Sequence, residues 1–174
     1  LVKNAGADRV VDLLRPHLKP GNGLRCITPS FSLFAFAELH KFLSALDRVQ
    51  LVLPHEDIDI NLLGTKNDRK SRNQLQTRWL AKQCASWVRD KVDLRQAPGP
   101  VPQGAAVISN TENGPEQVVL GSFAFSTDGL GLTPCNPLNL IQASETSAEA
   151  KQLAQWLDQQ WAALQGPESN NSDR

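Results

Sequence analysis

The first third of the chain alternates apolar runs of strand length with stretches of helical periodicity. Residues 24–28 and 49–53 are short apolar runs, and each is followed by a proline. Between them, large apolar residues recur at helical spacing, which predicts a helix over about 31–46 with its N-cap at Ser30. A strand–helix–strand order favours parallel pairing in an α/β sheet. An earlier apolar stretch, 10–18, predicts an opening helix that is interrupted at Pro16.

A second long periodic segment, predicted to be a helix from about Arg72 to Lys91, has two contrasting sides. At about 100° per residue, its apolar side chains gather on one side and three cations gather opposite them. The apolar side consists of Leu80, Cys84, Trp87 and Val88. The cationic side consists of Arg78, Lys82 and Arg89. We expect the first side to pack on a core and the second to face outward.

The remaining apolar runs predict more strands. Runs at 105–109 and 117–121 flank a turn at Asn113-Gly114 and predict a hairpin. Residues 92–95 and 138–141 have the pattern of two further short strands.

The chain is predicted to close with a helix. Thr146-Ser147-Ala148-Glu149 is a capping-box pattern that predicts a helix to about Leu164. Its spaced apolar residues are expected to be buried, and these are Leu153, Trp156, Leu157, Trp161 and Leu164. Together the elements predict an α/β fold, a mixed β-sheet flanked by helices.

The size of the chain suits one soluble domain. It has 174 residues, of which 40% are hydrophobic and 21% charged. We expect a single domain over 1–165 and a disordered tail over 166–174. No apolar run approaches the roughly 20 residues of a membrane helix, and no leader sequence opens the chain, so a cytoplasmic location without a membrane partner is expected. The chain contains no Met, which indicates a piece of a larger protein.

The cysteines are expected to be small core residues. Cys26, Cys84 and Cys135 lie far apart and form no CxxC pair. In a reducing compartment such cysteines favour packing over a disulfide or a metal site.

The charge of the chain is balanced overall, but its middle is basic. Residues 66–95 carry nine basic and three acidic side chains. A basic surface beside a polar loop is the usual footprint of nucleic-acid binding. The alternative is the ordinary solvated side of an amphipathic helix, and no aromatic residue lies within the basic loop to stack on a base. The candidate DNA-contacting residues are Arg69, Lys70, Arg72, Arg78, Lys82 and Arg89.

The most distinctive segment is 118–130, where a short apolar run ends at Gly121-Ser122 and small hydroxyl residues lead into Asp128-Gly129. A strand that ends in a tight turn offers N–H groups and hydroxyls, which suit a phosphate oxygen. The alternative is that the hydroxyls cap turns and helix ends. The candidate phosphate-binding residues are Ser122, Ser126 and Thr127.

Three segments of the chain, 28–32, 72–81 and 121–141, together resemble the phospholipase D-like (HKD) domain. The form they resemble occurs beside the motor domains of bacterial helicases and in restriction-type nucleases, and the resemblance covers most of 5–164. It implies a PLD-like α/β fold, and its implied partners are DNA, adjacent helicase domains and a second copy of the chain. It also implies that the intact parent protein is an ATP-dependent helicase.

The chain departs from this family at the reactive positions. Active members use a His-x-Lys pair, an Asn just after Gly-Ser, and a Glu on a later strand. The corresponding positions here are Gly104, Ala106, Ala124 and Leu138. Of the pattern, what persists is Gly121, Ser122 and Asn136. Phosphoryl transfer needs a nucleophile together with charge stabilisation, so we expect no catalytic residue, no metal and no cofactor.

The favoured hypothesis is a catalytically inactive PLD-like accessory domain of a larger bacterial DNA-processing protein. That protein would be a helicase or translocase with a defence or restriction role, and the domain would bind or position DNA or dock partners. One alternative is a divergent phosphodiesterase or nuclease that completes its site as a dimer. Another is a pure protein-interaction domain with an apolar patch around exposed tryptophans.

Overall fold

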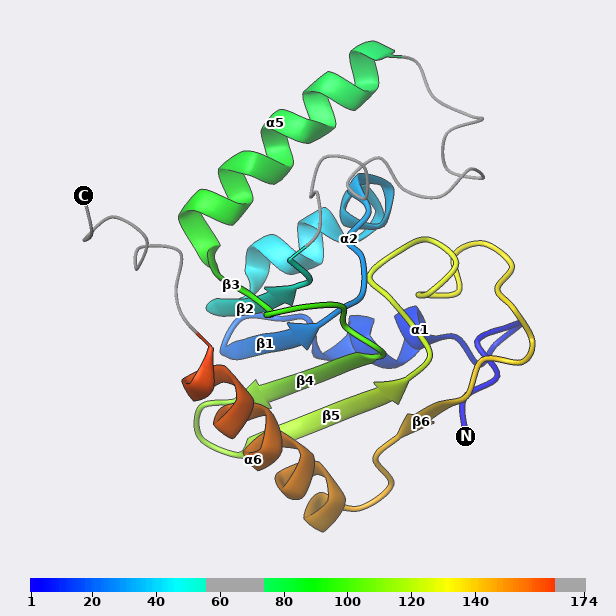
Figure 1. Ribbon diagram of the computed structural model, residues 1–174, viewed down its shortest axis with the longest axis vertical. Helices are drawn as coiled ribbons and strands as arrows, with labels where there is room; N and C mark the ends of the chain where they lie inside the picture. The colour runs from blue at the N-terminus through cyan, green and yellow to red at the C-terminus, as the bar shows by residue number, and fades with distance from the viewer. Residues whose placement is uncertain (56–73, 165–174) are drawn as a thin grey trace.

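The computed structural model describes residues 1–55 and 74–164, and it has a mixed α/β fold (Figure 1). Six strands form one sheet in the order β3-β2-β1-β4-β5-β6. The first three run parallel to one another, whereas β4, β5 and β6 are each antiparallel to the preceding neighbour. The predicted α/β class is confirmed, and the expected tail at 166–174 lies outside the described residues. The strands are β1 (Asn22–Ile27), β2 (Arg48–Leu53), β3 (Val92–Gln96), β4 (Gly104–Asn110), β5 (Gly114–Gly121) and β6 (Ile141–Ala143).

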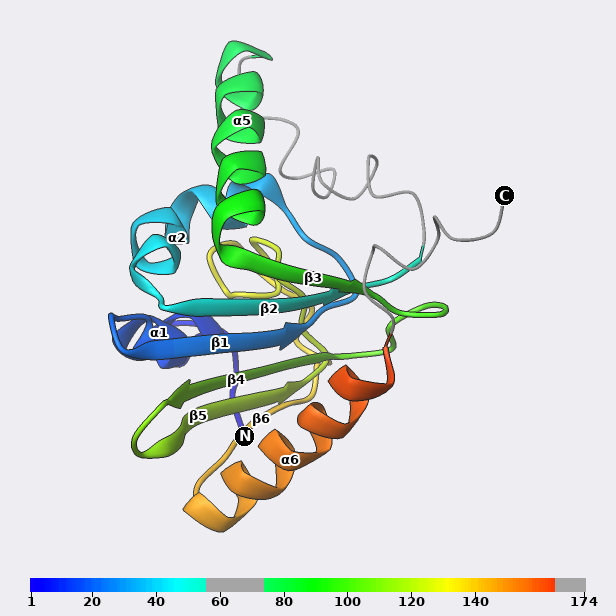
Figure 2. The ribbon, with the colours of Figure 1, turned by 90° about the vertical axis from the view of Figure 1, so that its left-hand side faces the viewer.

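Helices cover both faces of the sheet (Figure 2). One face packs against α1 (Val10–Leu14) and α2 (Leu33–Ala45) around the larger core. The other face packs against α6 (Ser147–Ala163) through a smaller apolar cluster over β4 and β5. A sheet covered on both faces needs nearly continuous apolar strands, which explains the runs in the sequence. Across 1–55 and 74–164, no helix is both long and apolar enough to cross a bilayer.

The opening helix is shorter than predicted. It stops at Leu14 and continues as one 3-10 turn, η1 (Arg15–His17), because Pro16 has no N–H to donate to the carbonyl four residues earlier. The predicted N-cap of α2 at Ser30 is wrong. Ser32 caps this helix instead, since its Oγ accepts the N–H of Phe34 at 3.2 Å.

The long basic helix is α5 (Gln74–Lys91), and it leads directly into β3. Its predicted apolar side is confirmed, because Leu80, Cys84 and Trp87 are buried. The Trp87 ring packs against Phe36 of α2 with centroids 5.2 Å apart. This packing fixes α5 against α2.

The hairpin forms as predicted, with Gly114 at a φ of 78° where the turn enters β5. The predicted strand at 138–141 is wrong, because the strand in this region is β6, which begins at Ile141. Leu138 and Leu140 are 88% and 62% exposed. The side chain of Asn136 accepts the N–H of Leu138 at 3.0 Å and so makes a turn where the apolar pattern suggested a strand.

The cap of α6 is close to the predicted capping box. Thr146 Oγ1 accepts the N–H of Glu149 at 3.2 Å, but the Glu149 carboxylate accepts from Glu145, one residue before the expected donor. Leu157 is buried as predicted, whereas Trp156 is 41% exposed, so its predicted burial is wrong. The sheet covers only one narrow stripe of α6, and Trp156 lies outside it.

Arg95 of β3 holds the C-terminal end of α6. Its guanidinium lies 4.2 Å from the ring centroid of Trp161 and donates to the carbonyls of Trp161 and Leu164. These carbonyls belong to the last turn of the helix, where a cation is favourable.

Candidate functional site

Two of the segments that carried the family resemblance meet where β1 and β5 end at the same edge of the sheet. We call this region the β1/β5 corner, comprising residues 28–32, 104–106 and 121–130. Thr28 Oγ1 accepts the N–H of Phe125 at 2.8 Å and donates to the carbonyl of Ser30 at 2.6 Å. The N–H of Ser32 donates to the carbonyl of Phe125 at 2.9 Å. These bonds tie the loop after β5 to the segment after β1.

Aromatic side chains fill the β1/β5 corner. Phe31 stacks on Phe125 with ring centroids 4.8 Å apart, and Trp87 of α5 lies 6.3 Å from Phe31. Phe123 packs over Gly104, so a Cβ at position 104 would lie 2.4 Å from the carbonyl oxygen of Phe123. The four aromatic residues are 5% exposed or less. The position that corresponds to the family's histidine is therefore packed as core.

The other positions that correspond to the family's reactive residues are not gathered into a reactive cluster. Ala106 is 1% exposed and belongs to the main core. Leu138 is highly exposed in the turn before β6. The side-chain oxygen of Asn136 accepts a hydrogen bond within the same turn. Neither a nucleophile nor a cation replaces the missing groups at these positions.

The three candidate phosphate-binding hydroxyls have different roles. Ser126 and Thr127 are 4% and 5% exposed. Ser126 Oγ donates to the Asp128 carboxylate at 2.7 Å and accepts the N–H of Gly129 at 3.1 Å, so it organises the turn. Thr127 Oγ1 lies 3.3 Å from Thr133 Oγ1. Ser122 is exposed, and the carboxylate of Asp128 beside Ser126 is unfavourable for an anion.

The two buried thiols offer no nucleophile. Burial raises the pKa of Cys26 to about 12 and that of Cys84 to about 11, so both stay protonated at neutral pH. Cys26 and Cys84 are core residues as predicted, whereas Cys135 is only partly buried, so its predicted core position is wrong. Within the part of the chain that the structure describes, no three His, Cys, Asp or Glu side chains gather closely enough to hold a metal ion.

The candidate DNA-contacting residues divide into two groups. Arg69, Lys70 and Arg72 lie outside the described residues. Arg78, Lys82 and Arg89 are exposed on α5, as the helical pattern predicted. Arg89 makes an ion pair with Asp90 at 3.3 Å and donates to Ser86 Oγ at 3.4 Å. Arg78 and Lys82 form no ion pair with any described residue, which leaves two cations for an anionic partner.

A groove lies between α2 and α5, beside these cations. Its volume is about 430 Å³, and it is lined by Phe36, His40 and Phe42 of α2 and by Trp79 and Gln83 of α5. Trp79 is 59% exposed and Phe42 is 37% exposed. No aromatic residue was expected beside the basic loop, but Trp79 follows Arg78 directly on α5 and is exposed. The dipeptide Arg78-Trp79 is the sequence signal that marks this surface.

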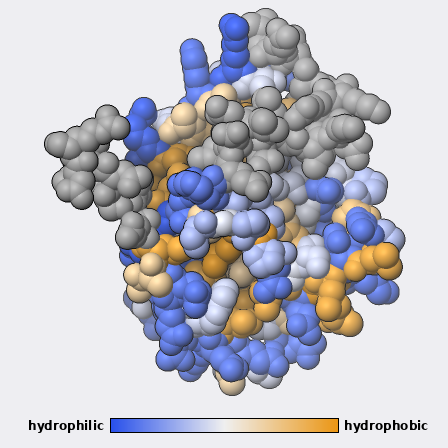
Figure 3. Space-filling model, viewed as in Figure 1, coloured by the Kyte–Doolittle hydropathy of each residue, from blue (hydrophilic) through white to orange (hydrophobic). Residues whose placement is uncertain are grey.

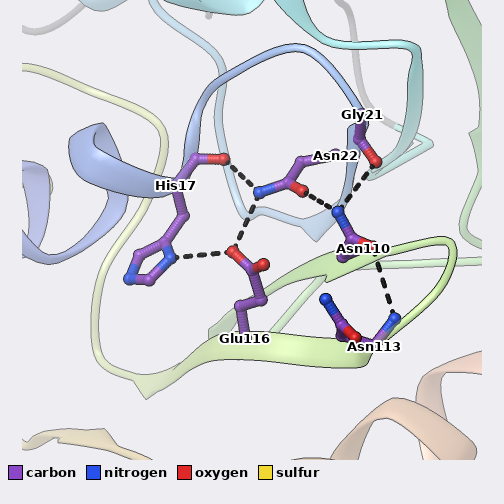
Figure 4. A network of polar contacts seen from close by, with 6 residues as sticks. All are labelled: His17, Gly21, Asn22, Asn110, Asn113 and Glu116. Atoms are coloured by element: carbon purple, nitrogen blue, oxygen red, sulfur yellow. Dashed lines mark hydrogen bonds and ion pairs between the residues drawn. The ribbon is translucent and has the colours of Figure 1, made fainter.

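A polar network lies at the opposite end of β1, where it joins the hairpin (Figure 4). His17 Nδ1 lies 3.1 Å from a Glu116 carboxylate oxygen, which also accepts from Asn22 at 3.0 Å. Asn110 Nδ2 donates to Asn22 Oδ1 at 3.0 Å. The hydrogen bond with His17 and then the one from Asn22 lower the pKa of Glu116 below its ordinary value. The network holds no hydroxyl or thiol nucleophile, so its role is to brace η1 and β1 against the hairpin.

Comparison with known proteins assigns no family to the chain. A scan against known protein families gives no match, and a search of curated proteins also gives none. The class that the fold and these surfaces define is a mixed α/β domain with a closed β1/β5 corner and an exposed basic helix.

Proposed function

We propose that this chain is a catalytically inactive PLD-like accessory domain that binds DNA through α5 within a larger DNA-processing protein. The observation that carries the proposal is the packing of Gly104 and Ala106. At the positions where that family keeps its nucleophile and its phosphate-holding cation, this chain has two buried residues without reactive groups. A catalyst for phosphodiester cleavage requires both functions.

Three features support an inactive corner over a dimeric enzyme. The aromatic residues leave no space at Gly104, the buried hydroxyls are engaged within the turn, and the buried thiols are protonated. A second copy would have to supply the nucleophile and the cation together, and it would have to reach a position covered by Phe123.

The basic side of α5 supports binding of a nucleic-acid backbone. Arg78 and Lys82 lie one turn apart on α5 and are exposed. Hydrophilic side chains stand out at the top of the molecule in the view of Figure 3. Cations that neutralise phosphates release counterions from the nucleic acid, so binding of this kind weakens as salt rises.

The test is a fluorescence anisotropy titration of labelled DNA at several salt concentrations. We expect salt-dependent binding, and Arg78→Ala with Lys82→Ala should lower the salt slope by about 2. The matched control is Lys3→Ala with Lys151→Ala, which removes two exposed cations near the N-terminus and on α6, away from α5.

The outcomes separate the three hypotheses. Binding that the α5 variant weakens and the control does not, without cleavage of the DNA, supports the proposal. Release of cleaved product by the wild type, reduced by Ser122→Ala, would instead support the phosphodiesterase. An absence of DNA binding at low salt would reject the proposal and leave the protein-interaction domain.

One observation favours a docking role as the second candidate. Leu138 and Leu140 are among the most exposed large apolar side chains of the described residues, and Figure 3 shows apolar atoms at the edge of the molecule where the segment before β6 runs. Exposed apolar side chains close together in the chain favour a protein contact. Leu138→Ser with Leu140→Ser should abolish any self-association seen by light scattering and leave DNA binding unchanged.

A further inference from the structure

The groove between α2 and α5 combines exposed aromatic rings with exposed cations. Trp79 is 59% exposed on one wall, and Phe42 is 37% exposed on the other. Among the described residues three aromatic side chains are exposed, Phe42, Trp79 and Trp156, and two of them line this groove. An exposed aromatic face beside a basic strip is the composition of a platform for unpaired bases.

The charges around this groove are mostly positive. Lys41 lines it, Arg78 and Lys82 flank Trp79 on α5, and the Arg15 guanidinium lies 5.6 Å from the centre of the Phe42 ring. None of these four cations forms an ion pair with a described residue, and the acidic side chain in the lining is Glu38. A partner that covers this groove therefore needs negative charge as well as flat apolar faces.

We infer that the groove between α2 and α5 binds single-stranded nucleic acid, with a base stacked on Trp79 and phosphates along Arg78, Lys82 and Lys41. The inference rests on the proposed function and narrows its substrate class. A duplex hides the faces of its bases, so a stacking platform selects single strands. The groove places two exposed rings beside several cations, and a single strand supplies flat bases and charged phosphates within the same few ångströms of chain.

The experiment measures anisotropy of a labelled oligodeoxythymidylate of about 20 nucleotides and of a duplex of the same length, at one low salt concentration. Trp79→Ala should weaken binding of the single strand about tenfold and change duplex binding by less than about twofold, and Trp79→Phe should restore most of the affinity. Trp156→Ala is the matched control, because Trp156 is also exposed but lies on α6 across the sheet. Since the Trp79 ring is mostly in solvent, thermal unfolding of Trp79→Ala should match the wild type.

Binding of the strand should also quench tryptophan fluorescence, and Trp79→Ala should remove that quenching. If Trp79→Ala leaves single-strand binding intact while Arg78→Ala with Lys82→Ala weakens it, the inference is overturned and the proposed function stands. If the wild type binds neither the single strand nor the duplex, both this inference and the proposed function are overturned. If Trp79→Ala changes only self-association on gel filtration, the occupant is a second copy and the inference is overturned.

Discussion

The β1/β5 corner and the groove between α2 and α5 have opposite characters. The corner carries the sequence pattern of a phosphodiester site, yet its aromatic residues are 5% exposed or less and its buried hydroxyls serve the turn. The groove is lined in part by the resembling segment 72–81, but it has none of the positions of the family's reactive residues, and it exposes Trp79 and Phe42 next to cations that form no ion pair with a described residue. Trp87 of α5 packs into the corner, and Trp79 of the same helix faces the groove.

Under the proposed function, the sequence pattern that suggested a phosphodiester site and the surface suited to binding lie in different parts of the molecule. The Gly-Ser turn and the Thr28–Ser32 segment keep their places because they hold the loop after β5 by backbone hydrogen bonds. These hydrogen bonds stabilise the fold, so the two segments have a structural role that requires no ligand. Exposed aromatic and basic side chains contribute little to folding, so a partner is the better explanation for them.

The largest expected effect comes from introducing a histidine in the corner. Gly104→His should destabilise the protein by more than about 3 kcal/mol, because the new side chain would overlap the Phe123 backbone. Urea denaturation followed by circular dichroism measures this loss. Gly99→Ala is the control, since nothing lies within 4 Å of a Cβ at that position. A stable Gly104→His variant that cleaves a phosphodiester would show that the corner is open.

The second prediction compares one phenylalanine from each region. Phe125→Ala should cost about 3 kcal/mol in the free energy of unfolding, since it removes a buried ring stacked on Phe31. Phe42→Ala should cost under about 1 kcal/mol, because this ring is already partly in solvent. Both are read from the same denaturation experiment. Equal costs would mean that the groove is as much a part of the core as the corner.

The third prediction tests the Thr28 hydroxyl, which accepts from the N–H of Phe125 and donates to the carbonyl of Ser30. Thr28→Val keeps the shape of the side chain but leaves the buried N–H of Phe125 without its acceptor, so we expect a loss of about 1–2 kcal/mol. Thr28→Ser keeps the hydroxyl and should lose less. Thermal melts compare the two variants, and a Thr28→Val variant as stable as the wild type would show that the hydroxyl does not stabilise the corner.

Much of the fold could be predicted from the sequence because local patterns determine it. The strand–helix–strand order gave the parallel pair β1 and β2, and the apolar side of α5 was read correctly from its spacing. The errors lie where a side chain redirects the backbone. Ser32 in place of Ser30 caps α2, and Asn136 makes a turn that delays β6 to Ile141.

The site was harder to predict, because burial depends on packing between distant segments. Ser126 and Thr127 look like exposed turn residues in the sequence, and only the packing of 122–130 on Thr28–Ser32 buries them. Trp156 has the spacing of a buried residue, but the sheet covers only a narrow stripe of α6. Helical spacing predicts which side of a helix packs against the rest of the protein. It does not predict how wide the buried part of that side is.

The smallest expected effect concerns the polar network at the far end of β1. It tests whether this network stabilises the fold, as the corner does, without contributing to DNA binding. The pKa of Glu116 is lowered by its bond with His17 and then by that from Asn22. A lowered pKa means that the folded carboxyl binds its proton less readily than the unfolded one. The contribution of this carboxylate to the free energy of unfolding is thus fully present above the ordinary pKa of 4.5. It is lost as the pH falls through the folded pKa.

Glu116→Gln should therefore lower the Tm by about 2–4 °C at neutral pH, and the gap to the wild type should shrink as the solution becomes more acidic than about pH 4. Glu112→Gln is the control on the same hairpin, because the Glu112 carboxylate makes no hydrogen bond with a described residue. DNA affinity should be the same in both variants, since neither touches α5. Parallel Tm curves at every pH would show that the carboxylate stabilises nothing there. A change in DNA affinity would place a second binding surface at the hairpin. The network would then belong with the groove between α2 and α5 and not with the β1/β5 corner.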